Sequence, residues 1–288
     1  MKQSKAVFWI FLFPCLFTFT FTVLVPSISG LYYSFTDWNG IGNDAGFIGL
    51  KNYITIFTEG EEFGRSFLYT LIFTALCVVI VNALAFGLGM LVTQKIRGRN
   101  ILRSIFFMPN LIGGILVGFV WQFIFTQVFN SMAKTLHLPF LENWLSTTTT
   151  ATMALIIVVV WQMSGYMMLI YIAQLQNIPD SLIESAKIDG ASAFQRLRFI
   201  TLPLMAPAFT IGLFLTLSNC FKLYDQNLTL TNGGPSNSTE MVAMNIFRTA
   251  FTQNELGLAQ AKAVLFLVVV AGITLTQLYI SKKREVEM

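Results

Sequence analysis

The sequence predicts an all-α membrane protein with six transmembrane helices. Of its 288 residues, 55% are hydrophobic and only 11% are charged, whereas a soluble domain carries about 25% charged residues. Apolar runs of roughly 20 residues, long enough to cross a bilayer as a helix, recur along the whole chain. Most of the molecular surface is therefore expected to face lipid rather than water.

Three apolar runs make up the first half of the chain. The first covers about residues 6–28 and follows Lys2 and Lys5. It is longer than the apolar core of a secretory signal and does not end at a small-residue cleavage site, so we interpret it as a membrane span. The second run covers about 67–93 and the third about 104–126.

The third run contains a G-x-x-x-G pattern formed by Gly114 and Gly118. Two glycines four positions apart lie on one face of a helix and allow a second backbone to approach closely. The pattern is common in apolar segments. It therefore predicts a close contact without identifying the contacting segment.

Three further runs make up the second half of the chain, at about 151–173, 204–224 and 261–280. Between the fourth and fifth spans lies a polar segment of mixed charge, residues 174–203. With six spans, both termini and this segment lie on the same side of the membrane.

The distribution of Lys and Arg predicts which side that is. Twelve of the 18 basic residues fall on the face that holds the termini, and six fall on the other face. Because basic residues accumulate on the cytoplasmic side, both termini are expected in the cytoplasm. The twelve are Lys2, Lys5, Lys95, Arg97, Arg99, Arg103, Lys187, Arg196, Arg198, Lys282, Lys283 and Arg284.

Two helix-start signals occur in the cytoplasmic segment. Ser181 with Glu184, and Ser192 with Gln195, each fit the capping box, in which a serine hydroxyl and an acidic or amide side chain satisfy backbone N–H groups reciprocally. Gly190 lies between the two signals, where a helix can end. The segment is therefore predicted to form a helix, a glycine break and a second helix.

Signatures of catalysis are missing from the sequence. It has no phosphate-binding G-x-x-x-x-G-K-[ST] loop, no H-E-x-x-H and no G-x-S-x-G pattern. His137 is the single histidine, and the three cysteines have no metal-binding spacing. We therefore predict no catalytic residue, no metal site, no cofactor bound by this chain and no contact with nucleic acid.

A family resemblance enters at Glu184-Ser185-Ala186, which is followed after three residues by Gly190 and then by an apolar stretch ending at Pro203. In order and spacing this segment resembles the EAA motif of bacterial ABC-importer permeases. Ser185 stands where that family has its first alanine, a replacement of one small residue by another.

Other segments extend the resemblance over nearly the whole chain. They are similar to the carbohydrate-uptake branch, particularly its MalF-type subunit, although the extra N-terminal spans and the large periplasmic insertion of that subunit are missing. The resemblance implies a minimal six-span permease of the type I fold, with residues 1–288 as one permease domain. The segments are Leu50–Tyr53, Arg103–Pro109, Leu230–Pro235, Thr239-Glu240 and Phe247–Phe251.

The resemblance implies a cytoplasmic coupling helix between the fourth and fifth spans, which docks on an ATPase. In this interpretation Glu184 contacts a basic residue of the ATPase, and small residues permit close approach. The alternative is that Glu184 acts only as a helix cap; one carboxylate can fill both roles. The implied ATPase contacts are Glu184, Ser185, Ala186, Asp189, Gly190 and Ala191.

A sugar site within the spans is also implied. Amide groups donate to and accept from sugar hydroxyls, and an aromatic ring covers the apolar face of a pyranose. The alternative role of such polar groups is hydrogen bonding between helices. Carried across segment by segment, the site consists of Asn110, Gln162, Met163, Tyr166, Thr216, Asn219, Cys220 and Leu223.

Charged residues near this site are few. Ser218, Lys222 and Asp225 would form one stripe if the fifth span were a continuous helix, and Lys222 could then pair with Asp225. A glycerol-phosphate importer would need more cations than Lys222. A proton-coupled carrier would need an ionisable residue deeper in a span. Both alternatives are weaker than a sugar importer.

The implied function is therefore that of a permease subunit of an ATP-driven importer for a di- or oligosaccharide, in a bacterial plasma membrane. The implied partners are a second homologous permease subunit in a heterodimer, two ATPase subunits that use ATP and Mg²⁺, and an extracytoplasmic solute-binding protein. The chain itself hydrolyses nothing.

Overall fold

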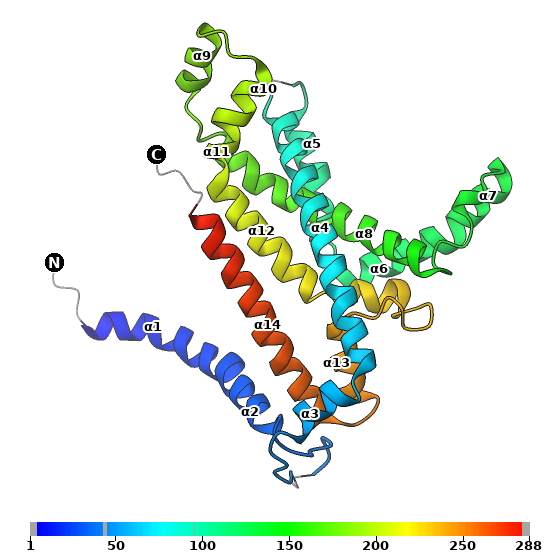
Figure 1. Ribbon diagram of the computed structural model, residues 1–288. Helices are drawn as coiled ribbons and strands as arrows, with labels where there is room; N and C mark the ends of the chain where they lie inside the picture. The colour runs from blue at the N-terminus through cyan, green and yellow to red at the C-terminus, as the bar shows by residue number, and fades with distance from the viewer. Residues whose placement is uncertain (1–4, 43–44, 95, 284–288) are drawn as a thin grey trace. The chain divides into compact units, whose positions relative to one another are not determined.

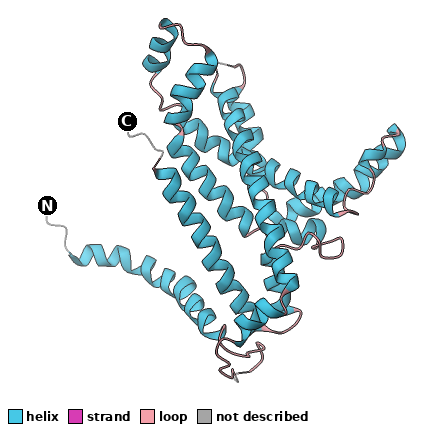
Figure 2. Ribbon diagram, in the orientation of Figure 1, coloured by secondary structure: helices cyan, strands magenta, loops and turns pink. Residues whose placement is uncertain are grey.

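A computed structural model describes residues 5–42, 45–94 and 96–283 of the chain. Throughout these residues the regular elements are helices (Figure 2), apart from one isolated bridge between Thr36 and Phe47. The all-α prediction is confirmed. Of the basic residues used to predict orientation, Lys2, Lys95 and Arg284 lie outside the described residues.

The chain divides into two compact units, and the boundaries between them fall within α4, α13 and α14. The first unit contains residues 1–63 and 245–268, and the second contains residues 64–244 and 269–288. Figure 1 labels the helices of both units in chain order. Each unit is described by itself below.

The described residues include five helices that are long and apolar enough to cross a membrane. A sixth candidate is a pair of helices, Ala193–Leu204 and Ala206–Phe221, bent by 67° at Met205. With this pair counted as one span, the number agrees with the predicted six. The five others are Phe8–Tyr33, Glu61–Thr93, Gly114–Leu136, Thr148–Leu175 and Leu256–Lys282.

The third span differs from its predicted bounds of 104–126. Helix α5 (Arg99–Phe107) ends just before Pro109, and the α-helix resumes only at α6 (Gly114–Phe123). Proline lacks the N–H that a helix interior needs, and glycine is a poor helix former, so the chain breaks between the two helices. The candidate span is therefore Gly114–Leu136.

In the first unit, the N-terminal helices lead into a loop that is fixed by one buried asparagine. Helices α1 (Lys5–Phe19) and α2 (Val25–Tyr33) are joined by a π-helical turn. After the loop, α3 (Lys51–Thr58) begins, and its Asn52 side-chain amide donates to the carbonyls of Ser34 and Thr36 at 3.0 and 2.8 Å. These bonds satisfy loop carbonyls that have no helical partner.

Residues 245–268, from helices α13 (Val242–Phe251) and α14 (Leu256–Lys282), form the other part of the first unit. The ammonium of Lys262 on α14 donates to the Asn245 side-chain oxygen at 3.0 Å and to the Thr249 hydroxyl at 2.8 Å. At the start of α14, the Gly257 N–H donates to the Trp38 carbonyl at 2.8 Å. The loop before α3 is thereby tied to α14.

The second unit is built around α8 (Thr148–Leu175), whose apolar side chains form two buried clusters with α4 (Glu61–Thr93) and α12 (Ala206–Phe221). A polar network crosses one cluster. The Tyr171 hydroxyl donates to the Asn82 side-chain oxygen, and the Asn82 amide donates to the Thr216 hydroxyl at 3.3 Å. Interhelical bonds of this kind replace water inside a membrane.

The predicted close approach at the G-x-x-x-G pattern is confirmed on α6. A Cβ placed on Gly118 would lie 1.7 Å from the Thr229 hydroxyl oxygen, and one on Gly114 would lie 2.8 Å from Asp225 Cβ. The contacting segment is the short π-helical turn Asn227–Thr231 and the residues just before it. The two glycines therefore allow the segment that follows the fifth span to pack closely against α6.

Candidate functional site

The first half of the polar segment between the fourth and fifth spans (residues 174–203) is α9 (Asp180–Ile188), and it ends as predicted at a glycine. Gly190 has φ +78°, in the left-handed region that glycine adopts most easily. The Gly190 N–H donates to the Lys187 carbonyl at 3.1 Å and the Ala191 N–H donates to the Ala186 carbonyl at 2.9 Å. This paired pattern closes the helix end and turns the chain sharply.

Only one of the two predicted capping boxes forms. At α10 (Ala193–Arg196), the Gln195 N–H donates to the Ser192 hydroxyl at 3.3 Å and the Ser192 N–H donates to the Gln195 side-chain oxygen at 2.7 Å. The box at Ser181 and Glu184 is wrong. Because α9 already begins at Asp180, Ser181 has a helical backbone and cannot cap the helix start.

The segment of α9 and α10 exposes most of its side chains. Glu184 is exposed, and no described residue forms a hydrogen bond or an ion pair with its carboxylate. Among the apolar side chains of the segment, Ile188 is 86% exposed and Phe194 is 67% exposed. Arg196 is half-buried instead, and its guanidinium donates to the Ala191 carbonyl, which anchors the turn to α10. The exposed groups are available to another protein.

A recess of about 310 Å³ lies at this turn. Of the six predicted ATPase contacts, Asp189, Gly190 and Ala191 line it, together with residues of the second helix. Glu184, Ser185 and Ala186 lie on α9 and do not line the recess. The additional lining residues are Gln195, Arg196, Phe199 and Ile200.

A larger cavity, of about 440 Å³, lies within the second unit. It brings together residues from the break before α6, from the middle of α8 and from the end of α12. Six of the eight predicted substrate residues line it: Asn110, Gln162, Met163, Tyr166, Asn219 and Leu223. Segments more than 100 positions apart in the chain thus meet at one place.

The other two predicted residues do not line this cavity. Thr216 is fully buried, donates to the Gly212 carbonyl at 2.7 Å and accepts from Asn82. Cys220 is also fully buried and packs in an apolar cluster. Both lie on the face of α12 that packs against the helix bundle, whereas Asn219 points away from it and is exposed.

Gln162 holds the cavity wall together. Its side-chain N–H donates to the Ile112 carbonyl at 2.9 Å, and its side-chain oxygen accepts from the Gln226 amide at 2.7 Å. The Ile112 carbonyl has no helical partner, because the chain is extended at Ile112, between the 3-10 turn Met108–Leu111 and α6. An unsatisfied carbonyl is costly at membrane depth, so the buried Gln162 side chain stabilises the break.

The predicted stripe of Ser218, Lys222 and Asp225 is wrong, because α12 ends at Phe221. Lys222 and Asp225 nevertheless both line the cavity. Tyr224 also lines it, as do Val159 and Gln226, which the sequence did not predict. The polar run from Lys222 to Gln226, directly after an apolar span, was the available signal for Gln226.

Curated relatives match almost the full length of the chain. It is 50% identical over 281 residues to the probable starch degradation products transport system permease protein AmyD of Thermoanaerobacterium thermosulfurigenes, covering 98% of this chain and 96% of the relative. It is 30% identical over 241 residues to the trehalose/maltose transport system permease protein MalF of Thermococcus litoralis, covering 83% and 81%.

Solved structures agree on the fold. A bacterial ABC transporter involved in the import of the acidic polysaccharide alginate contains a chain that superimposes with a TM-score of 0.84, at 21% identity, over 97% of this chain and 96% of that one. This similarity shows a shared fold. A sequence model of binding-protein-dependent transport system inner membrane components matches residues 84–286. The chain therefore belongs to that family, the integral membrane permeases of binding-protein-dependent transport systems.

Proposed function

We propose that this chain is one of two homologous permease subunits of an ATP-driven importer that carries a di- or oligosaccharide across the bacterial plasma membrane. The observation that carries the proposal is the 440 Å³ cavity, in which amide and aromatic side chains from three separate segments converge. The names of the sugar-transporting relatives support the same substrate class.

The lining of the cavity suits a neutral sugar. Its volume lies in the range of about 300–1,000 Å³ found for small-molecule sites. Asn110 and Asn219 offer amide donors and acceptors for hydroxyl groups, and the Tyr166 ring can cover an apolar sugar face. Lys222 and Asp225 carry opposite charges, which disfavours a strongly charged substrate. Gln162 and Gln226 hold the wall and position the groups beside them.

Coupling to ATP occurs at the cytoplasmic segment. Two ATPase subunits hydrolyse ATP with Mg²⁺, and one of them receives α9, with Glu184 contacting a basic residue. The exposure of Glu184, Ile188 and Phe194 supports such a contact, because a buried helix would hide these groups. In this topology both termini lie in the cytoplasm, and residues 1–288 act as one permease domain.

Sugar reaches the outer side of the permease on an extracytoplasmic solute-binding protein. The alginate transporter has been solved in complex with an alginate pentasaccharide-bound periplasmic protein, which supports this arrangement. Closure of the ATPases on ATP moves the coupling segments and opens the cavity outward, and the binding protein releases sugar at that moment.

Affinity purification of the tagged chain in mild detergent, followed by mass spectrometry, tests the proposal. A second permease and an ATPase should co-purify, and a sugar-loaded binding protein should stimulate ATP hydrolysis of the reconstituted complex. A solitary protein that moves solute along a proton gradient would contradict the proposal.

A further inference from the structure

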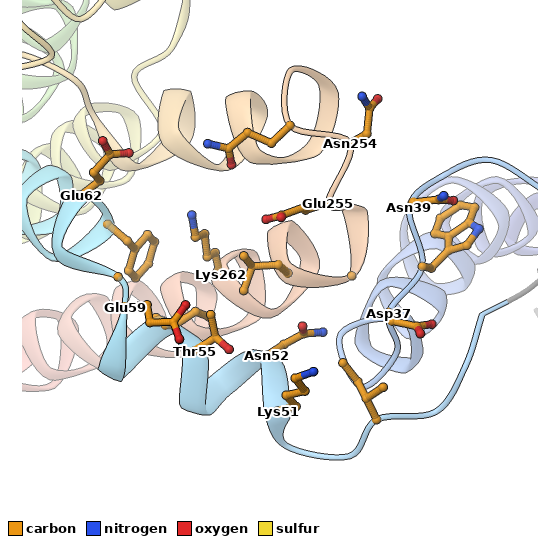
Figure 3. A pocket seen from close by; sticks show the side chains of 18 residues that line it. Asp37, Asn39, Lys51, Asn52, Thr55, Glu59, Glu62, Asn254, Glu255 and Lys262 are labelled. Carbon is orange, nitrogen blue, oxygen red and sulfur yellow. The ribbon is translucent and has the colours of Figure 1, made fainter.

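A second cavity, of about 520 Å³, lies within the first unit. Its walls are α3, the loop that precedes it, the start of α4 and the start of α14. Figure 3 shows its polar side chains, with the Lys262 ammonium and the Glu255 carboxylate directed into the space between the other labelled groups. None of the residues proposed above for sugar binding or ATPase coupling belongs to it.

The lining combines groups of three kinds. Four carboxylates line the cavity, those of Asp37, Glu59, Glu62 and Glu255. Four side-chain amides accompany them, those of Asn39, Asn52, Gln253 and Asn254, and two ammonium groups belong to Lys51 and Lys262. This site therefore offers many hydrogen-bond acceptors together with fixed donors.

Lys262 is the fixed donor at the inner wall. It is only 8% exposed, and its ammonium is held by Asn245 and Thr249 and lies 5.7 Å from the centre of the Phe63 ring. A buried ammonium held in this way keeps its position when a ligand enters. The carboxylates of Glu59, Glu62 and Glu255 are on exposed residues, so they can adjust to a ligand.

Trp38 adds an aromatic surface. Its ring stacks on Tyr33, with centroids 4.3 Å apart and an interplanar angle of 22°, and its indole N–H donates to the Gly42 carbonyl at 3.1 Å. The ring is therefore held in place by contacts outside the cavity that it lines. Such a ring offers an apolar surface against which a pyranose can pack.

Several ligand classes fit this lining poorly. An anion would meet four carboxylates. A metal ion would need a cluster of at least three acidic, histidine or cysteine ligands at binding distance, and the described residues contain no such cluster. A small cation would meet the Lys262 ammonium. A sugar hydroxyl, in contrast, accepts from an ammonium and donates to a carboxylate at the same time.

We infer that this cavity is an accessory carbohydrate-binding site, separate in its residues from the cavity in the second unit. The inference rests on the proposed function in one respect, because the substrate sugar is taken as its ligand and the predicted topology places these loops outside the cytoplasm. There the site holds an incoming oligosaccharide before or during its transfer.

Hydrogen–deuterium exchange of the full transporter complex in lipid nanodiscs tests the inference, with millimolar maltotriose as the probe. Sugar binding should slow amide exchange in residues 37–63 and 251–262. In the Glu59→Gln/Glu255→Gln variant, the sugar concentration needed for half of this protection should rise about tenfold or more, because hydrogen bonds to charged acceptors are lost. Protection of residues 219–226 should stay unchanged.

Glu61→Gln is the matched control, because Glu61 lies in the same first turn of α4 as Glu62 but does not line the cavity. This variant should behave as the wild type. Protection confined to residues 219–226 would overturn the accessory site and leave the proposed function intact. Protection of residues 37–63 that appears only when a binding protein is added would also overturn it, in favour of a protein contact.

Discussion

The turn between α9 and α10 and the cavity of the second unit are built in opposite ways. The bonds that shape the turn between α9 and α10 join residues at most five positions apart, such as Ala191 to Ala186 and Ser192 to Gln195. The cavity wall depends on bonds across 50 and 64 positions, from Gln162 to Ile112 and from Gln226 to Gln162.

This difference has a mechanical consequence. A segment held by local bonds keeps its shape when it moves as a body, which suits a contact that transmits motion from an ATPase. A cavity held by long-range bonds changes shape when the helices shift. Variants in the turn between α9 and α10 should therefore disturb transport without unfolding the protein, whereas variants around the cavity should affect both transport and stability.

Gly190→Pro should have the largest effect. Proline requires φ near −65°, whereas Gly190 has φ +78°, and proline also removes the N–H that donates to Lys187. We expect sugar uptake in reconstituted proteoliposomes to be abolished while membrane insertion and thermal stability remain. Gly190→Asn is the control, because asparagine tolerates the left-handed region, and it should retain most uptake. Full uptake by Gly190→Pro would exclude the coupling role of this turn.

Gly165→Ala should destabilise the second unit. The added Cβ would lie 1.7 Å from the Phe106 carbonyl oxygen, a backbone atom that cannot move aside without shifting α5. Overpacking of this kind costs about 1–3 kcal/mol or more, so the melting temperature in detergent should fall by several degrees. The control is Gly87→Ala on α4, where nothing lies within 4 Å of the new Cβ. An unchanged melting temperature in Gly165→Ala would show that α5 and α8 adjust freely.

Asn219→Ala separates cavity residues from buried ones. Loss of a side-chain hydrogen bond to sugar should raise the KM for uptake about tenfold with little change in stability, since Asn219 is exposed to the cavity. Cys220→Ala should leave KM unchanged, because its sulfur packs in the apolar cluster. Equal KM values for wild type and Asn219→Ala would argue against this cavity as the substrate site.

Tyr171→Phe should have the smallest effect. It removes one donor to Asn82 inside the bundle, and a single hydrogen bond contributes about 0.5–1.5 kcal/mol. We expect a small decrease in the thermal stability of the detergent-solubilised protein and normal uptake. Tyr279→Phe, whose ring is 63% exposed, is the control and should leave stability unchanged. A loss of transport in Tyr171→Phe without destabilisation would point to a direct role in the transport cycle.

The sequence alone determined the features that depend on composition and on short-range chemistry. Length and apolarity predict the number of spans, because a bilayer requires about 20 apolar residues of helix. The helix end at Gly190 and the cap at Ser192 are likewise local, and both were predicted from a few adjacent residues. The cap predicted at Ser181 was wrong because the helix begins one residue earlier, at Asp180 after Pro179. The local sequence is compatible with either of these two neighbouring helix starts.

Only the tertiary structure decided which face of α12 lines the cavity, and that Gln162 bonds to both Ile112 and Gln226. Thr216 and Cys220 were predicted to line the cavity together with Asn219 and Leu223, but both are buried against other helices. The physical reason is that an apolar span has little amphipathic pattern to show which face packs and which lines a cavity. That choice is made by contacts between helices far apart in the chain.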